Sequence, residues 1–317
     1  MAVFDFPSRR AWTLLAATGG LAYGSFTAMG VTVRAASLLL PASAVLLCLG
    51  GSLFYTKVRP DRRLAVAMAG TAFILTFGAT AGVLTYPAAA IGGALQDQWF
   101  MGFERALGIN WPGLASRMTA YPALNLVWTF AYMSSLPQIA VTVLVLGFAS
   151  RHERLAAYLT LILATLLCIL VLFVLAPALG PIPSYAIDGD LYRRLGEGGK
   201  SFLADFLALR SGRFATFDLA KLEGIITFPS FHCALAILTG WALAPMRRIG
   251  TAAIILNGLV ILSTVPQGGH YIADILAGSL ITVVALAIAT GAGRSFALAA
   301  TSALPAGASG ETPALRA

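Results

Sequence analysis

The stretch TFPSFHCALAIL, residues 227–238, places a histidine inside a run of apolar residues. A run of this kind is typical of a helix surrounded by protein or lipid. An ionisable ring in such a helix is costly unless a partner compensates for it, and intramembrane histidines therefore mark functional sites. His232 is the first residue whose role has to be explained.

The composition of the whole chain indicates a membrane protein. Its 317 residues are 58% hydrophobic and 11% charged, and the mean hydropathy is +0.84, whereas soluble domains carry about 25% charged residues. Apolar runs of about 20 residues span a bilayer. The candidates are residues 11–30, 35–56, 64–93, 120–147, 155–178, 229–246, 249–266 and 270–292. We expect an all-α, polytopic integral membrane protein with about eight transmembrane helices.

Basic residues predict how these helices are oriented. If the eight runs cross the membrane in alternating directions, one side carries Arg9, Arg10, the run KVRPDRR at 57–63, Arg151, Arg154, Arg247, Arg248 and Arg294. By the positive-inside rule this side is cytoplasmic. We therefore expect both termini in the cytoplasm and a multi-pass protein of the cell inner membrane. Segments 94–119 and 179–228 and the turn 266–269 then lie on the periplasmic side.

Neither the charge nor the cysteines indicate a further partner. The formal charge of +8 comes from bases scattered over short loops, so a nucleic-acid partner is not expected. Cys48, Cys168 and Cys233 lie in apolar runs without metal-binding or disulfide spacing. We expect no metal, no cofactor and no obligate protein partner. The tail 294–317, rich in Ala, Ser, Gly and Pro, is expected to be disordered.

The last apolar run opens with GGHYIADILAG, residues 268–278, where His270 and Asp274 are four residues apart. This spacing puts both side chains on one face of a helix. A carboxylate at that depth needs a partner, and the imidazole of His270 is the nearest one. The pair has the pattern of a nucleophile or base with its orienting group, although a buried pair that merely tightens the bundle has the same spacing.

The run that contains His232 begins at Pro229, a residue suited to the first position of a helix. The free amides of Ser230 and Phe231, together with the helix dipole, would then favour an anion. If this helix and the one that carries His270 are neighbours, the two histidines flank that anion. One of them can attack phosphorus, and the other can protonate the leaving oxygen and deprotonate the acceptor.

These residues resemble the motifs of a known family. Pro229-Ser230-Phe231-His232 is similar to the P-S-x-H motif of the type 2 phosphatidic acid phosphatase superfamily, and residues 263–274 resemble its S-R-x5-H-x3-D motif, with His270 and Asp274 in place. The resemblance implies a six-helix core and metal-independent cleavage of a lipid phosphate. It also implies that His270 is the nucleophile, that Asp274 orients it, and that His232 is the acid and base.

The chain departs from this pattern in two ways. Thr264 stands where the family has arginine, and no K-x6-R-P motif precedes His232. The phosphate then needs other cations, and segment 179–228 offers Arg193, Arg194, Lys200, Arg210, Arg213 and Lys221. We take Arg210, Arg213 and Lys221, with Ser230 and Phe231, as the candidate phosphate-binding residues. The missing arginine resembles the inositolphosphotransferase-like branch, which includes inositol phosphorylceramide synthases.

The resulting hypothesis is a membrane lipid phosphatase that acts at the periplasmic face through a phosphohistidine. The alternative is a phosphotransferase that moves a phosphoryl headgroup, for example phosphoinositol, to another lipid or alcohol. A transporter or scaffold that has kept the fold is the non-enzymatic alternative. In domain terms, residues 1–63 would add two accessory transmembrane helices to a catalytic membrane core, residues 64–293, which includes both outer segments.

Two polar segments allow more than one interpretation. Residues 97–111, DQWFMGFERALGINW, have the aromatic and charged residues typical of a helix lying in the membrane interface. The run 120–147 carries a polar stripe that either lines a headgroup cavity or makes hydrogen bonds between helices. Its members are Asn125, Tyr132, Ser134, Ser135 and Gln138.

Overall fold

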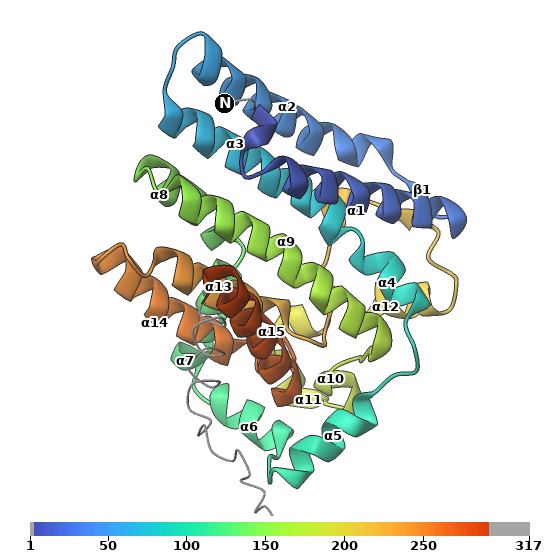
Figure 1. The fold of residues 1–317 in the computed structure, drawn as a ribbon. Helices are drawn as coiled ribbons and strands as arrows, with labels where there is room; N and C mark the ends of the chain where they lie inside the picture. Colours follow the sequence, from blue (N-terminus) through green and yellow to red (C-terminus); the bar gives the residue numbers. More distant parts are fainter. Residues whose placement is uncertain (1–2, 292–317) are drawn as a thin grey trace, which may run out of the picture.

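The computed structural model describes residues 3–291 and is a bundle of helices (Figure 1). The all-α prediction is confirmed, because the only sheet in this part of the chain is a parallel pair of two-residue strands. These are β1 (Thr32–Val33) and β2 (Thr216–Phe217). The tail that was expected to be disordered lies outside the described residues.

Each of the eight apolar runs folds as one helix or as consecutive helices. They form α1 (Arg9–Ala28), α2 (Ala35–Lys57), α3 (Arg62–Phe77) with the π-helical turn η2 (Gly78–Gly82) and α4 (Thr85–Ile91), α7 (Pro122–Ser134) with α8 (Pro137–Phe148), α9 (His152–Leu175), α13 (Phe231–Leu243), α14 (Arg248–Ser263) and α15 (Ile272–Thr290). The remaining helices are η1 (Val3–Asp5), α5 (Asp97–Ala106), α6 (Trp111–Met118), α10 (Pro181–Ser184), α11 (Gly189–Arg194), η3 (Glu197–Gly199), α12 (Leu203–Arg210) and η4 (Leu219–Lys221).

By length and composition, fewer helices are able to cross a membrane than the eight that the sequence predicts. Among the described residues, α2, the unit Arg62–Ile91, α9 and α15 are long and apolar enough, and the α7–α8 pair, bent by 57°, makes up to five. Helix α13 has 13 residues, about 20 Å at ~1.5 Å per residue, whereas the hydrocarbon core is about 30 Å thick. The structure therefore supports several spans, and the count of eight stays a prediction.

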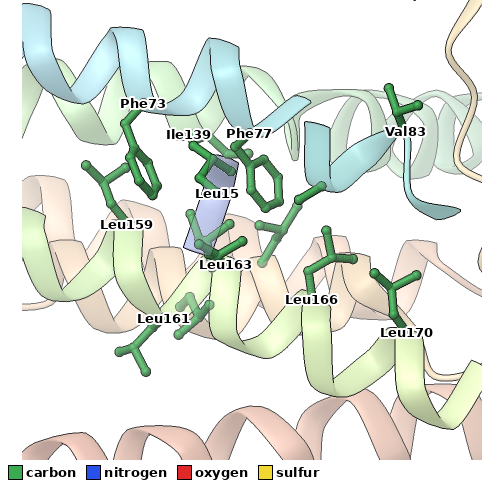
Figure 2. Packing of buried hydrophobic residues seen from close by; sticks show 14 of the residues in the cluster. Leu15, Phe73, Phe77, Val83, Ile139, Leu159, Leu161, Leu163, Leu166 and Leu170 are labelled. Carbon is green, nitrogen blue, oxygen red and sulfur yellow. The ribbon is translucent and has the colours of Figure 1, made fainter. Parts of the chain in front are cut away.

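The main core lies between α3 and α9. Figure 2 shows Phe73 and Phe77 on one side and leucines of α9, among them Leu159 and Leu166, on the other; all are buried. Leu15 of α1 and Ile139 of α8 close this core from two further directions. Because α9 is buried along much of its length, it is the central helix around which the others pack.

The two helices that were expected to be accessory differ in their packing. Helix α1 contributes fully buried side chains, Leu15 and Phe26, to the main core. Helix α2 lies at the edge of the bundle against α3 (Figure 1), and its one buried residue is Ser52, whose hydroxyl donates a hydrogen bond of 2.9 Å to the carbonyl oxygen of Ala65. Only α2 is therefore peripheral to the packed bundle.

The basic loops and the outer segments lie at opposite ends of the bundle. At one end, Arg63 Nε donates to Ser150 Oγ over 3.0 Å, and Arg154 Nε donates to the carbonyl oxygen of Ala242 over 2.8 Å. At the other end, the β1–β2 pairing joins the loop after α1 to segment 179–228. This separation agrees with the predicted threading, and the compartment that each end faces stays a prediction.

Helices α13 and α15 are in direct contact, as the interpretation of the two histidines requires. The amide of Ser230 donates to the carbonyl oxygen of Asp274 over 3.0 Å. Gly278, one turn further along α15, faces the Ser230 carbonyl oxygen so closely that a Cβ atom would collide with it. A residue without a side chain is therefore needed where the two helices cross.

We predict that Gly278→Ala separates α13 from α15. Because the added methyl meets backbone rather than a movable side chain, the variant should lose about 1–3 kcal/mol of stability and most of its activity. The matched control is Gly240→Ala on α13, where a Cβ atom meets nothing within 4 Å. Thermal unfolding in detergent measures both variants, and equal unfolding midpoints would contradict the prediction.

Candidate active site

His270 is held between α15 and α13. Its Nδ1 lies 3.2 Å from Asp274 Oδ2, and the same carboxylate oxygen accepts the amide hydrogen of Tyr271 over 2.8 Å. Its Nε2 lies 3.3 Å from Ser230 Oγ. Both His270 and Asp274 are buried. A carboxylate on Nδ1 fixes that nitrogen as the proton carrier and leaves Nε2 with its lone pair directed away from Asp274.

His232 stands opposite His270 in the first turn of α13. The two rings are 6.3 Å apart between centroids and inclined by 58°. Tyr132 of α7 stacks on the outer side of His232, with centroids 4.5 Å apart and an angle of 23° between the planes. The structure therefore brings together the three residues with predicted chemical roles, and Tyr132 fixes the orientation of the His232 ring.

The N-terminus of α13 differs from the sequence-based expectation. The helix begins at Phe231, two residues after Pro229, because the hydroxyl of Ser230 caps it by accepting the Cys233 amide hydrogen over 3.4 Å. The Ser230 amide is already used by the Asp274 carbonyl oxygen. It is therefore not free for an anion, and the predicted pair of amides is wrong for Ser230.

A cavity of about 330 Å³ is lined by both histidines. Tyr132, Gly198 and Gly268 line it close to the histidine rings, and Phe77 and Phe231 form part of its apolar wall. These two phenylalanine rings are 6.3 Å apart. The cavity thus combines two nitrogen bases with a mainly hydrocarbon lining, as expected of a site for a lipid with a small polar group.

The three predicted phosphate-binding bases do not line this cavity. Arg210 donates to the carbonyl oxygens of Gly92 and Gly93, at the end of α4, where the helix dipole attracts a cation. Arg213 Nε bonds Ser211 Oγ over 3.0 Å. Lys221 lines a separate pocket of about 290 Å³ together with Arg34 and two aspartates. In the described chain the structure therefore does not bring these bases to the histidines.

The other bases of segment 179–228 are also engaged elsewhere. Arg193 pairs with Asp190 over 3.4 Å, Arg194 donates to the carbonyl oxygen of Thr119 over 3.0 Å, and Lys200 pairs with Glu197 over 2.7 Å. None of these three bases lines the cavity in the described chain.

Thr264, at the position of the family's arginine, has a structural task. It is buried, and its carbonyl oxygen accepts the amide hydrogens of Gly268 and His270 over 3.1 and 3.2 Å. Its hydroxyl bonds the carbonyl oxygen of Ile261 over 2.6 Å. The position therefore shapes the turn that leads to His270 and supplies no cation.

The segment 97–111 does not simply lie on a surface, because it holds the start of α15. The indole Nε1 of Trp111 donates to the carbonyl oxygen of His270 over 2.9 Å, the hydroxyl of Tyr271 donates to Asp97 over 3.0 Å, and the amide of Ile272 donates to Glu104 over 3.0 Å. Sequence analysis missed these roles. The available signal was the seven-residue spacing of Asp97 and Glu104, which places two acids on one helix face.

Asp97 and Glu104 are both buried carboxylates. Asp97 also accepts the amide hydrogens of Leu179 and Gly180 over 2.9 and 3.0 Å and the Ser184 hydroxyl over 2.9 Å. Burial raises the pKa of Glu104 above its usual 4.5, and the hydrogen bonds that Glu104 accepts act in the opposite direction. Each acid thus links the outer segment to the turn that carries His270.

The polar stripe of α7 and α8 divides between the two alternatives. Gln267 donates to Asn125 over 2.8 Å, and Asn257 of α14 donates to Gln138 over 2.8 Å, so these residues make hydrogen bonds between elements. Tyr132, in contrast, lines the cavity. Within residues 3–291, no three His, Cys, Asp or Glu side chains are grouped in a way that would hold a metal ion.

Comparison with known proteins identifies a family for most of this region. The model of the PAP2 superfamily matches residues 98–288, which include α5 to α13 and the turn that carries His270. No curated protein and no solved structure matches the chain. The match therefore includes His232, His270 and Asp274. It begins after α4, so the part of the cavity wall that α3, η2 and α4 contribute lies outside it.

We predict that Asp97→Asn disturbs the site without touching a substrate. The amide cannot accept on both sides, so hydrogen bonds from Tyr271 or the residues 179–184 are lost, at a cost of about 1–3 kcal/mol. Turnover should fall while KM changes little. The control is Asp188→Asn, at an exposed position where the side chain makes no capping bond. Steady-state kinetics with thermal unfolding distinguishes the two, and wild-type turnover in Asp97→Asn would refute the positioning role.

Proposed function

Because the chain belongs to the PAP2 superfamily, we propose that it cleaves the phosphate ester or pyrophosphate of a membrane lipid through a phosphohistidine intermediate. Family membership supports a phosphatase or phosphotransferase type of activity on a lipid phosphate. The observation that carries the finer proposal is the arrangement of His270 between Asp274 and the cavity, with His232 facing it at 6.3 Å.

In the first step, Nε2 of His270 attacks phosphorus and the bond from phosphorus to the leaving oxygen breaks. The proton on Nδ1 stays with the His270–Asp274 pair, which stabilises the positive charge that develops on the ring. His232 gives its proton to the leaving oxygen, so the lipid departs as a neutral alcohol when the substrate is an ester. Ser230 Oγ, now 3.3 Å from Nε2, has to release this nitrogen to phosphorus.

In the second step, His232 takes a proton from water, and the resulting hydroxide oxygen attacks phosphorus. The nitrogen–phosphorus bond breaks, inorganic phosphate leaves, and both histidines return to their starting protonation. Tyr132 supports this exchange of roles because its stacked ring keeps His232 directed at the same point in both steps.

Transfer to an alcohol is the second candidate function. The chemistry is the same, with an alcohol in place of water. Two observations favour it: the cavity of about 330 Å³ is larger than a water molecule needs, and Thr264 stands where the family's arginine would be. A transporter or scaffold is the least supported reading, because His232, His270 and Asp274 lie together as chemistry requires.

We predict that wild-type protein releases or transfers phosphate and that His270→Ala lowers turnover at least about 10³-fold, as expected for the loss of a nucleophile. The assay uses detergent micelles with radiolabelled phosphatidic acid, undecaprenyl pyrophosphate or phosphatidylinositol, with and without ceramide or diacylglycerol. Label in inorganic phosphate indicates hydrolysis, and label in a new lipid indicates transfer. Undiminished turnover in His270→Ala would refute the nucleophile assignment.

We also propose that the cavity opens toward the periplasm from the inner membrane, with both termini in the cytoplasm. The support is the gathering of the basic loops at the opposite end of the bundle. Cysteines introduced by Asp188→Cys and Arg59→Cys report on the two ends, since both positions are exposed. An impermeant maleimide added to intact cells should label only the first, and the reverse pattern would invert the topology.

A further inference from the structure

The cavity that contains the histidines also contains a carboxylate. Glu223, in the extended stretch before α13, lines it together with Gly82 and Thr85 of the η2–α4 region. Within the described chain, Glu223 is the only Asp, Glu, Lys or Arg that lines the cavity. Apart from the two histidines, the cavity wall therefore offers an acid and no Lys or Arg, although a phosphate is expected inside.

Glu223 is fixed in place, and its carboxylate lacks a partner. Its amide donates to the hydroxyl of Tyr86 over 3.1 Å. Its Oε2 atom is buried and has no hydrogen-bond partner among residues 3–291. A buried carboxylate oxygen without a donor costs free energy. Glu223 as a whole is only half-buried and lines the cavity, so a group bound there can approach the carboxylate and donate the missing hydrogen bond.

The two ends of the cavity are chemically different. We call the part of the cavity beside the two histidines its histidine end. Tyr132 and Gly268 belong to it, since Tyr132 stacks on His232 and a Cβ atom on Gly268 would touch both His270 and the Tyr132 ring. The carboxylate end lies at Gly82 and Leu222, which are also in contact with each other. Coulomb repulsion disfavours a phosphate beside Glu223, and much of the remaining lining, Phe77 and Phe231 included, is apolar.

We propose that Glu223 binds a hydrogen-bond-donating group of the substrate, a hydroxyl or an ammonium, while the phosphate occupies the histidine end. This inference rests on the proposed function and specifies its substrate class. The group belongs either to the headgroup of the phosphorylated lipid or to an alcohol that accepts the phosphoryl group. In both cases the ligand is anionic at one end and a hydrogen-bond donor at the other.

The test compares Glu223→Ala and Glu223→Gln with wild type, and Glu153→Gln, an exposed glutamate outside the cavity, is the control. The lipids are phosphatidic acid, which has no alcohol on its phosphate, phosphatidylinositol and phosphatidylethanolamine. We expect Glu223→Ala to raise KM about 10- to 100-fold for a lipid whose headgroup reaches Glu223. KM for phosphatidic acid should stay constant or fall, because a repelling charge is removed.

The isosteric variant identifies the donor. If the donor is an ammonium, it needs the negative charge, so KM should rise as much in Glu223→Gln as in Glu223→Ala. If the donor is a hydroxyl, the amide of Glu223→Gln can still accept its hydrogen bond, and KM should rise only about threefold. If the group belongs to the acceptor, the KM of glycerol or ethanolamine added as acceptor rises and the KM of every donor lipid stays constant. If Glu223→Ala does not fold, Glu223→Gln alone carries the comparison.

Equal changes for all lipids and acceptors, or changes no larger than those in Glu153→Gln, would overturn the proposal. Binding of the same lipids to variants made in the His270→Ala background, measured by native mass spectrometry, separates it from the proposed function. Selective binding that depends on Glu223, without turnover in wild type, would reject the enzyme and keep the subsite. Turnover without any selectivity through Glu223 would reject the subsite alone.

Discussion

The hydrogen bonds between the α5–α6 segment and residues 270–272 are the constraint on which the site depends. Helix α15 begins two residues after His270, and its first amides have no partners within the helix. Glu104 accepts one of them, Asp97 accepts the Tyr271 hydroxyl, and Trp111 binds the His270 carbonyl oxygen. His270 is therefore held by its backbone as well as by Asp274. Two buried acids are tolerated because several donors converge on them.

The proposed phosphate would meet few cations in the cavity. The bases of segment 179–228 bind backbone carbonyls, hydroxyls or acids elsewhere, and Thr264 shapes a turn. The groups left to stabilise negative charge at the histidine end are the N-terminus of α13 and the two imidazoles. The Ser230 amide is not among them, because it donates to the Asp274 carbonyl oxygen. A site of this kind stabilises one developing charge by positioning rather than by a high density of positive charge.

Contacts between residues close in sequence could be predicted, whereas contacts with partners distant in sequence could not. The contact between His270 and Asp274 agrees with their four-residue spacing, although His270 lies just before α15 and not on it. The approach of α13 to α15 was only a condition in the sequence analysis, and the structure shows it at Gly278. Arg210 binds the backbone carbonyl oxygens of Gly92 and Gly93. Since every residue has a carbonyl oxygen, no sequence pattern predicts this contact. The place of Glu223 on the cavity wall could not be predicted either, because only the folded structure shows which loop residues line a cavity.

Helix α13 is short because it begins only at Phe231, where Ser230 caps it. The chain before this helix is extended, and Glu223 and Thr227 of that stretch line the cavity. Ser230 ends that extended stretch by capping the helix, and the same hydroxyl contacts Nε2 of His270. The cap therefore fixes both where α13 begins and where His232 meets His270. Helix α13 therefore has 13 residues, about 20 Å at ~1.5 Å per residue, and carries His232 in its first turn, opposite His270.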